Sequence, residues 1–545
     1  MSTVVKDIIL DNKFLHNQNA NHRSYMQDLA DFIQPRKAWI TSIRTKGERI
    51  KFNFLYDVTA ILALRDAASN FNTHLTDASS RWFGLETLDK NHMKSHDVRT
   101  YFKEVVDIMI SILDNSNFYN NIQEFFTDFL GFSPSSYSML SDPKDFVRFQ
   151  AIPVKESMRV VDANGRLTEF HRNFRLTARQ AVQMWGPQNV GKEILDSFTD
   201  SSNGGSKGQF QEFDFIHYVG PRHVRDVSKS DSVNMPIQSL WIAVKGEHLI
   251  KESGFIEMPI MSEVFYADSD DPNGFSPAMD ILAVIKLVNA QQRTFIRSDM
   301  KSADPALMLP SRGFALPLNL NPAATNYRDP KTNKDDIQLI PTGGKLSMTL
   351  DHITRNQDII REGFFIPLFR SLSELTKQMT IPEVQQRIAE NMRVLGPVVG
   401  RVLHGVLDPT IIRLFNMLQR EGMLPDPPIE IQEQDFAPVY LSNLAKVQKQ
   451  SQITDIQLYL NDIAAVGDVK PAIYDNIDED KVANVLARLR GITPEIQREE
   501  DVIERIRQTK AEQDQLVAQL QAGGAVAAAA KDAGAAEKAM AEAAA

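Results

Sequence analysis

The feature that most constrains this 545-residue chain is a pair of long helical segments on either side of a compact insertion. Ser276-Pro277 is a strong helix start, with serine as the N-cap and proline at the first helical position, and helical spacing continues to about Lys301. LSMTLDHITRNQDIIREGFF, residues 346–365, is spaced like a helix again. The residues between them are rich in proline, glycine and asparagine. The pattern predicts a hairpin-like helical stalk with an irregular module at its tip.

Two kinds of sequence precede this stalk. Helical spacing predicts a helical N-terminal block, with helices at Phe54–Leu75, Asp97–Leu113 and Tyr119–Leu130. From Phe146 to Glu263, alternating apolar and β-branched residues predict a β-rich module, in which Asn164-Gly165 is a two-residue hairpin signal. A short helix is expected inside that module, capped by Thr177 and closed by Gly186.

A helix breaker lies inside the periodic stretch that follows the stalk. The apolar residues there are mostly three or four positions apart: Val384, Ile388, Met392, Leu395, Val399, Val402, Val406, Leu414 and Leu418. A proline inside a helix removes one backbone hydrogen bond and costs about 3 kcal/mol unless the helix bends. The stretch is therefore either one kinked helix or two helices joined at Leu395-Gly396-Pro397.

The segment FFIPLFRSLSELTKQMT, residues 364–380, joins the stalk to this periodic stretch. Pro367 interrupts a helix, two serines weaken it, and the basic residues Arg370 and Lys377 stand among apolar ones. We expect a mobile loop. The alternative is a continuous amphipathic helix whose core residues are Phe364, Leu368, Leu372 and Leu375.

Composition excludes several classes of protein. A formal net charge of -10 argues against a surface that binds nucleic acid throughout, because such binding needs clustered Lys and Arg. The absence of cysteine excludes disulfides, thiolate metal sites and cysteine nucleophiles. The N-terminus lacks the apolar core of a signal peptide, and no apolar run is long enough to span a bilayer.

The sequence contains no convincing motif of an enzyme active site. Pro341–Lys345 faintly resembles a phosphate loop but lacks the first glycine and the final serine or threonine, so a plain turn is favoured. The pair His92 and His96 has no recognisable third zinc ligand. The acidic clusters 478–480 and 499–501 are interpreted as solvated faces. We therefore expect no catalytic residue, no metal and no cofactor.

Residues 379–428 carry the pattern T-x-x-E-V, L-G-P, and L-x-P followed by R-x-F, in that order. The matching positions are Thr380, Glu383, Val384, Leu395 to Pro397, Leu407, Pro409, Arg413 and Phe415. Other pieces agree in order, including RWFGL at Arg81–Leu85, DANGRLTEFHRNFRLTARQAVQMWG, SPAMDILAVIKLVN, and SNLAKVQKQ at Ser442–Gln450. From near residue 50 to near residue 515 the chain resembles the portal, or head-to-tail connector, proteins of short-tailed bacteriophages. It departs from them at NGFSPAM, where the family usually has tyrosine-glycine-arginine.

The resemblance implies a predominantly helical α+β fold with an elongated portal architecture. Its parts would be a wing (1–275), a first stem helix (276–302), a clip (303–345), a second stem helix (346–366), a tunnel loop (367–381), a kinked wing helix and its return (382–440), a helical crown (441–520) and an alanine-rich barrel helix or tail (521–545). In this arrangement the long helix bends at Gly396, Pro397 and Gly400.

The function implied is that of a ring, usually of twelve identical subunits, at one capsid vertex. Double-stranded DNA would pass through it without sequence preference during packaging and ejection. Expected partners are the terminase motor, tail adaptor proteins, and the major capsid and scaffold proteins, with assembly in the host cytoplasm and no membrane. Candidates to face DNA in the tunnel loop are Arg370, Lys377 and Gln378, and the clip docking candidates are Arg312, Arg328, Lys331, Lys334, Asp335 and Asp336.

Two other classes of protein compete with this interpretation. A phosphoryl-transfer enzyme or nuclease of the packaging machinery would need a phosphate loop or an acidic metal site, and neither is convincing here. A scaffold or adaptor protein bound to the ring would be shorter and would lack the helix-insertion-helix pattern.

Overall fold

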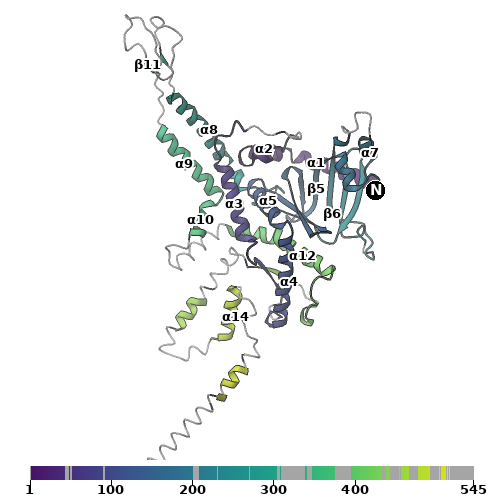
Figure 1. Cartoon of the computed structure of the whole chain (residues 1–545), viewed down its shortest axis with the longest axis vertical. Helices are drawn as coiled ribbons and strands as arrows, with labels where there is room; N and C mark the ends of the chain where they lie inside the picture. Colours follow the sequence, from purple (N-terminus) through teal and green to yellow (C-terminus); the bar gives the residue numbers. More distant parts are fainter. Residues whose placement is uncertain are drawn as a thin grey trace, which may run out of the picture. The chain divides into compact units, whose positions relative to one another are not determined.

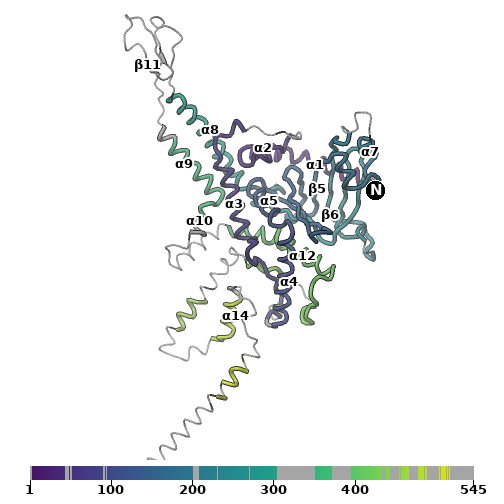
Figure 2. The backbone as a smooth tube through the Cα atoms, viewed as in Figure 1, coloured from purple at the N-terminus to yellow at the C-terminus, as the bar shows by residue number. Residues whose placement is uncertain are grey.

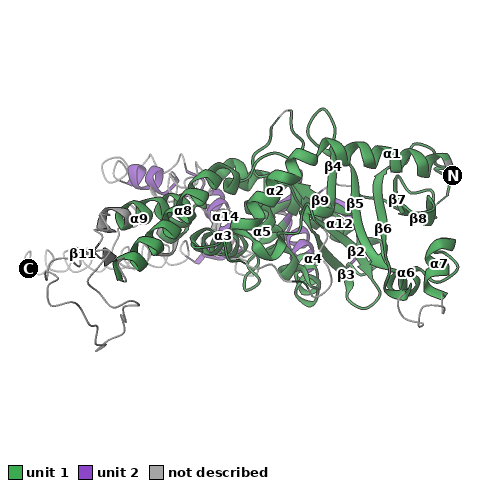
Figure 3. Cartoon of the chain, turned by 90° about the horizontal axis from the view of Figure 1, so that it is seen from above, with its two compact units in different colours: residues 1–84, 105–424, 437–452 green, residues 85–104, 425–436, 453–545 purple. Residues whose placement is uncertain are grey.

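The computed structural model describes residues 2–42, 48, 52–89, 92–199, 208–229, 231–268, 270–303, 307–308, 338–339, 346–374, 395–432, 436–441, 453, 456–464, 477–490, 503, 505–510, 512–513 and 515. The chain divides into two compact units. Unit 1 comprises Met1–Gly84, Val105–Leu424 and Ala437–Gln452, and unit 2 comprises Leu85–Glu104, Pro425–Phe436 and Ile453–Ala545 (Figure 3). Helices and antiparallel sheets are both present, which confirms the α+β class.

The N-terminal block is helical, as predicted. Its helices are α1 (Ser2–Gln18), α2 (Ala20–Ile33), α3 (Thr59–Leu75), α4 (His96–Asn115) and α5 (Phe118–Gly131), with short 3-10 turns η1 (Pro35–Lys37) and η2 (His92–Lys94). Helix α3 starts five residues later than the spacing predicted, because the Asp57 carboxylate accepts the backbone N–H of Thr59 at 2.9 Å. Strand β1 (Phe83–Thr87) follows α3.

A three-stranded antiparallel sheet packs on α5 in the order β3-β2-β9. Its strands are β2 (Ser135–Asp142), β3 (Phe146–Ile152) and β9 (Ile260–Glu263). Side chains from α5 and the residue before it occupy the free edge of β3: Asn117 exchanges two hydrogen bonds with the main chain of Phe149, and Asn121 accepts the Ala151 N–H. The edge that would otherwise pair with another strand is therefore already hydrogen-bonded at these positions.

The β-rich module contains a five-stranded antiparallel sheet in the order β4-β5-β6-β7-β8. The strands are β4 (Ser157–Val161), β5 (Leu167–Thr177), β6 (Glu212–Pro221), β7 (Ile237–Ala243) and β8 (His248–Phe255). The predicted two-residue turn at Asn164-Gly165 is wrong, because residues 162–166 separate β4 from β5. Asp162 accepts the backbone N–H groups of Asn164 and Arg166, and Gly165 has a φ of 79°.

Each face of this sheet carries its own apolar core. Helices α6 (Ala178–Trp185) and α7 (Lys192–Thr199) cover the face that bears Phe213 and Phe215. Helix α1 covers the opposite face, where Ile216 and Leu240 lie, so successive residues of a strand alternate between the two cores (Figure 1). The predicted short helix is confirmed as α6: Thr177 and Gln180 form a capping box, and Gly186 ends the helix at a φ of 83°.

The stalk follows as α8 (Pro277–Ala303) and α9 (Leu346–Gly363), which lie side by side in Figures 1 and 2. Between them the structure describes only the two-residue strands β10 (Leu307–Met308) and β11 (Gln338–Leu339), which pair with each other. Helix α10 (Ile366–Glu374) comes next. Later elements are helical residues 395–402, the π-helical turn η6 (Leu403–Leu407), α12 (Asp408–Arg420), the 3-10 turn η7 (Ile429–Ile431), β12 (Phe436–Tyr440) and α14 (Glu479–Arg490). Two further 3-10 turns are η3 (Val154–Glu156) and η4 (Gly208–Phe210).

Candidate functional site

The stalk begins at a buried cap. The Ser276 Oγ accepts the backbone N–H of Met279 at 3.3 Å and donates its own proton to the carbonyl of Gly131 at 3.0 Å. Pro277 occupies the first helical position, where its missing N–H leaves no hydrogen bond unmade. The predicted helix start is confirmed, and the hydroxyl that caps α8 also joins it to the end of α5.

The two stalk helices come into close contact at a glycine. A Cβ placed on Gly363 would lie 2.5 Å from Cγ2 of Ile281, so no larger residue fits without a shift. About two to three turns further up the stalk, Asn356 donates from its side chain to Oε1 of Gln291 at 3.1 Å. Residue 281 meets 363 and residue 291 meets 356, so the two helices run antiparallel.

A segment without regular secondary structure, residues 52–58, braces both helices at this level. Asn289 of α8 accepts the Tyr56 N–H at 2.7 Å and donates to the Phe54 carbonyl at 2.9 Å. Gln357 of α9 donates to Oδ2 of Asp57 at 2.7 Å. The sequence did not indicate this role for Asn289 and Gln357, because isolated amides on helices usually face solvent.

Beyond the brace, α8 and α9 lead to the insertion between them, which the sequence predicted to be the clip. The backbone pairs Leu307 with Leu339 and Met308 with Gln338, so β10 and β11 bring the two ends of the insertion together. The clip docking candidates Arg312, Arg328, Lys331, Lys334, Asp335 and Asp336 lie outside the residues that the structure describes.

The segment after the stalk differs from the expected loop. Residues 366–374 form α10, so the loop prediction is wrong there, and Arg370 is an exposed residue of a helix. Pro367 starts this helix rather than interrupting one, because a proline in the first turn has no hydrogen bond to lose. The alternative of a helix is confirmed for residues 366–374, but this helix does not continue from α9, because Phe365 has a φ of 61°. Residues 375–380 lie outside the described part of the chain.

Aromatic contacts anchor α10 to α3. The Phe369 ring is buried and lies 5.4 Å from the Phe71 ring and 5.6 Å from the His74 ring, centroid to centroid. Arg370 therefore projects from a fixed helical turn. The other two tunnel-loop candidates, Lys377 and Gln378, lie outside the described residues.

The helix after α10 is described only from residue 395, so a wing helix that bends at Gly396, Pro397 and Gly400 stays a prediction. A Cβ on Gly396 or Gly400 would meet nothing within 4 Å, so neither glycine is needed for close packing. The irregularity that the structure does contain lies further on, in the π-helical turn Leu403–Leu407.

Two residues account for this π-helical turn. Pro409 has no N–H to donate to the carbonyl four residues back, and Asp408 donates instead to the carbonyl of Leu403, five residues back. A Cβ on Gly405 would lie 2.0 Å from Oε2 of Glu263, so a larger residue there would displace this carboxylate at the end of β9. The sequence held both signals, although Gly396-Pro397 was the more conspicuous break.

Helix α12 is joined to the sheets by a buried arginine. Arg413 donates to the Met139 carbonyl at 3.3 Å, to the Glu257 carbonyl at 2.9 Å and to the Glu257 carboxylate at 3.2 Å. Its guanidinium also lies 5.4 Å from the centroid of the Phe255 ring. Burial lowers the pKa of Arg413 to about 10, although the Glu257 carboxylate acts in the opposite direction. Arg420 and Asn416 bind the same carboxylate.

Residues 8–497 match the family model described as "Bacteriophage head to tail connecting protein". This chain belongs to the bacteriophage head-to-tail connecting protein family. The chain is 26% identical over 526 residues to "Portal protein" of Salmonella phage epsilon15, covering 95% of this chain and 93% of the relative. It is also 26% identical over 514 residues to "Probable portal protein" of Bordetella phage BPP-1, covering 93% of this chain and 91% of the relative.

The match confirms the resemblance to portal proteins that the motifs carried. It also gives the R-x-F motif of this head-to-tail connecting protein a physical reason. Arg413 holds α12 to the middle of β2 and to the segment after β8, and Phe415 is buried on the same helix. The motif is explained by packing, because both side chains lie in the interior of unit 1 rather than on its surface.

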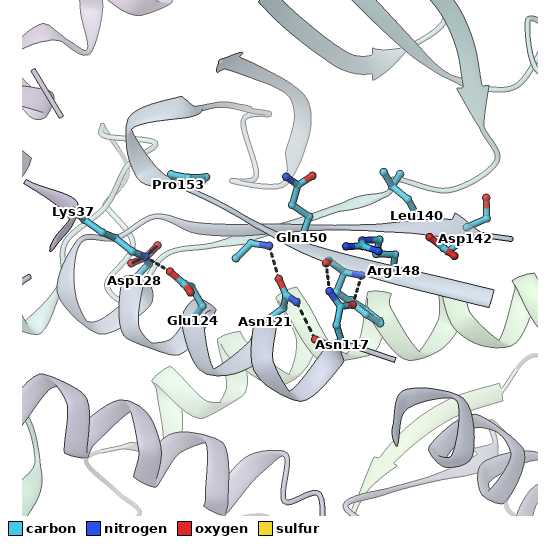
Figure 4. A pocket seen from close by; sticks show the side chains of 13 residues that line it. Lys37, Asn117, Asn121, Glu124, Asp128, Leu140, Asp142, Arg148, Gln150 and Pro153 are labelled. Atoms are coloured by element: carbon cyan, nitrogen blue, oxygen red, sulfur yellow. Dashed lines mark hydrogen bonds and ion pairs between the residues drawn. The ribbon is translucent and has the colours of Figure 1, made fainter. Parts of the chain in front are cut away.

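A cleft of about 520 Å³ lies between α5 and the β2–β3 hairpin of this connector protein (Figure 4). Lys37 enters it and pairs with Glu124 and Asp128, each at 2.7 Å. Burial alone would lower the pKa of Lys37, but the two carboxylates outweigh it and raise that pKa. The charge of Lys37 is therefore balanced by its two partners. Two amide side chains that line the cleft, Asn117 and Asn121, are already hydrogen-bonded to β3. We assign the cleft a packing role.

The remaining sequence candidates are also accounted for where the structure describes them. Asp478 caps α14 by accepting the Lys481 N–H at 3.1 Å, and Asp480 pairs with Arg507 at 2.5 Å, which fits the interpretation as a solvated acidic face. Across the described ranges, no group of three or more His, Asp or Glu side chains is arranged to hold a metal ion. None of the described helices is both long and apolar enough to cross a membrane.

Proposed function

We propose that this head-to-tail connecting protein forms a ring of twelve copies at one vertex of the capsid. Double-stranded DNA passes through the ring into the head during packaging and out of it during ejection. The proposal is supported above all by the paired stalk. At about 1.5 Å per residue, the 27 residues of α8 extend over about 40 Å, slightly more than one turn of duplex DNA.

In this ring the stalk helices form the wall of the passage. Arg370, Lys377 and Gln378 face the DNA, and each contact with the phosphate backbone is weak and screened by salt. The clip residues dock the terminase motor during packaging and the tail adaptor afterwards. The wing contacts the major capsid and scaffold proteins, and assembly takes place in the host cytoplasm. The protein acts as a conduit and a docking platform, and a separate motor supplies the chemistry.

Two measurements test this proposal directly. Native mass spectrometry of the purified chain should give a twelve-subunit mass, and averaged electron micrographs should show a closed ring with a central channel. Capsids assembled without the chain should contain no packaged DNA. A monomer, or an open polymer with no rotational symmetry, at micromolar protein concentration would contradict the proposal.

A further inference from the structure

The two helices of the stalk carry opposite charge on the edges that face away from each other. On α8 the exposed cations Arg293, Arg297 and Lys301 follow one another at intervals of four residues. At about 100° per residue, they lie about 200° to 280° around α8 from Gln291, the residue that faces α9. The nearest carboxylate of this half of α8, Asp299, is on another side of the helix. We call this row the basic edge.

Helix α9 has the complementary pattern. Its exposed carboxylates Asp351, Asp358 and Glu362 lie about 200° to 240° around the helix from Asn356, the residue that faces α8. Arg355 also lies on this face, where it is flanked by Asp351 and Asp358 at four and three residues. Arg361 binds Asp358 from the side, at 2.6 Å. We call this row the acidic edge.

The heights of the two edges along the stalk also correspond. The Asn356–Gln291 hydrogen bond places these two residues at one level of an antiparallel pair. Six residues outward from this bond lead to Arg297 on α8 and to residue 350 on α9, next to Asp351. At about 1.5 Å per residue, Arg297 and Asp351 therefore lie within about 2 Å of the same height. They cannot meet within one chain, because they project from opposite edges of the hairpin.

From this arrangement we propose that the basic edge of one stalk binds the acidic edge of the stalk of the next copy, with Arg297 opposite Asp351. The inference rests on the proposed ring. Such an interface is heterologous, since it joins two different surfaces of identical chains, and repeated head to tail it closes into a ring when the rotation fits. Complementary charge would set the register and the order of neighbours more than the total affinity.

Charge reversal in mixed assemblies tests this pairing. Arg297→Glu alone places a second carboxylate opposite Asp351. Asp351→Arg alone places a second guanidinium opposite Arg297. Each variant should therefore need a protein concentration about tenfold higher to form rings. In an equal mixture, alternating copies of the two variants bring opposite charges together at every interface, with the native signs at one interface and the reversed signs at the next. Mixing the two defective proteins should restore assembly to about the wild-type concentration, and no pairing within one chain predicts such rescue.

The controls separate this inference from the proposed function. Arg65→Glu reverses an exposed charge on α3, outside both edges, and should assemble normally. Circular dichroism of each unmixed variant checks that its fold is intact. If the wild-type chain forms no ring, the proposed function fails. If the wild-type chain forms rings and both variants do so equally well at low salt, only the pairing of the edges fails. Rings that assemble normally with Arg297→Glu but retain less DNA would overturn the pairing in favour of a DNA contact.

Discussion

His217 is buried in the five-stranded sheet in a form that resists protonation. Its ring stacks on Trp241 with centroids 3.7 Å apart, and its Nε2 lies 2.9 Å from the Ser239 hydroxyl oxygen. Burial, reinforced by the positive charge of Arg172, lowers the pKa of His217 to about 3. In the folded chain the imidazole is therefore neutral at every pH above about 3, whereas an unfolded chain takes up the proton near pH 6.5.

The free energy of unfolding of this sheet should accordingly fall as the pH drops from about 6.5 towards 3. The sign follows because only the unfolded chain binds the extra proton in this window, and the slope is at most about 1.4 kcal/mol per pH unit. Urea unfolding followed by tryptophan fluorescence should show a steeper slope in the wild-type chain than in His217→Gln, where His22 and His74, whose pKa values burial also lowers, still contribute. His223→Gln, at an exposed position, is the matched control. Equal pH profiles for the wild-type chain and His217→Gln would disprove the assignment.

Arg370 is expected to act on DNA through its charge. Replacing Arg370 and Lys377 with alanine should leave ring assembly intact and weaken the hold on packaged DNA. Each phosphate contact removed should lower the slope of log K against log salt by about 0.9. DNA retention in assembled particles, measured at several salt concentrations, checks the prediction. Lys6→Ala with Arg65→Ala removes two exposed cations from α1 and α3 as the control, and retention equal to that control argues against the DNA-facing role.

At the scale of elements, the contact between α8 and α9 gives a clear packing prediction. Gly363→Ala places a methyl group 2.5 Å from Cγ2 of Ile281 and should lower the free energy of unfolding by about 1–3 kcal/mol. Gly400→Ala is the control, since its Cβ meets nothing within 4 Å and alanine favours a helix. Chemical denaturation of both variants measures the difference. If Gly363→Ala with Ile281→Ala loses as much as the sum of the single changes, the clash is not the cause.

Local signals decided which elements could be predicted from the sequence. Ser276-Pro277 and the Thr177–Gln180 capping box act within one helical turn, so residue types alone located α8 and α6. Pro367 misled because a proline both ends helices and begins them, and only the left-handed Phe365 before it decides which. Pro409, one signal for the π-helical turn, is visible in the sequence, but the approach of Glu263 to Gly405 joins positions more than a hundred residues apart. Spacing within the chain could not reveal that approach.

The candidate site was predictable to the same extent. The stalk followed from helical periodicity, and the same periodicity predicted helix around Arg413, where the structure has α12. The brace at Asn289 and Gln357 could not be foreseen, because it depends on residues 52–58 lying across both stalk helices. The proposed match between the basic edge and the acidic edge depends on the relative height of α8 and α9. The hydrogen bond between Asn356 and Gln291 fixes that height, and only a structure supplies it.

For the molecule as a whole, the formal net charge of -10 shapes how the protein meets DNA and protein partners. An acidic surface repels phosphate at long range, and this repulsion is screened beyond about 10 Å at 0.1 M salt. In the proposed function, attachment of a motor or an adaptor would then rely on a local surface with its own charge pattern. We propose the predicted clip for this role, because β10 and β11 pair the two ends of the insertion between the stalk helices.

Clip variants should therefore separate docking from assembly. Lys331→Ala with Lys334→Ala removes two cations from the clip and leaves α8, α9 and both edges of the stalk unchanged. Rings should form normally, while binding of the terminase motor should weaken by about tenfold, mostly through slower association at low salt. Surface plasmon resonance with assembled rings measures both the affinity and the association rate. Lys144→Ala, on the exposed turn between β2 and β3, is the control for loss of a surface cation. Motor binding equal to that of the control at every salt concentration would show that these cations do not form the docking surface.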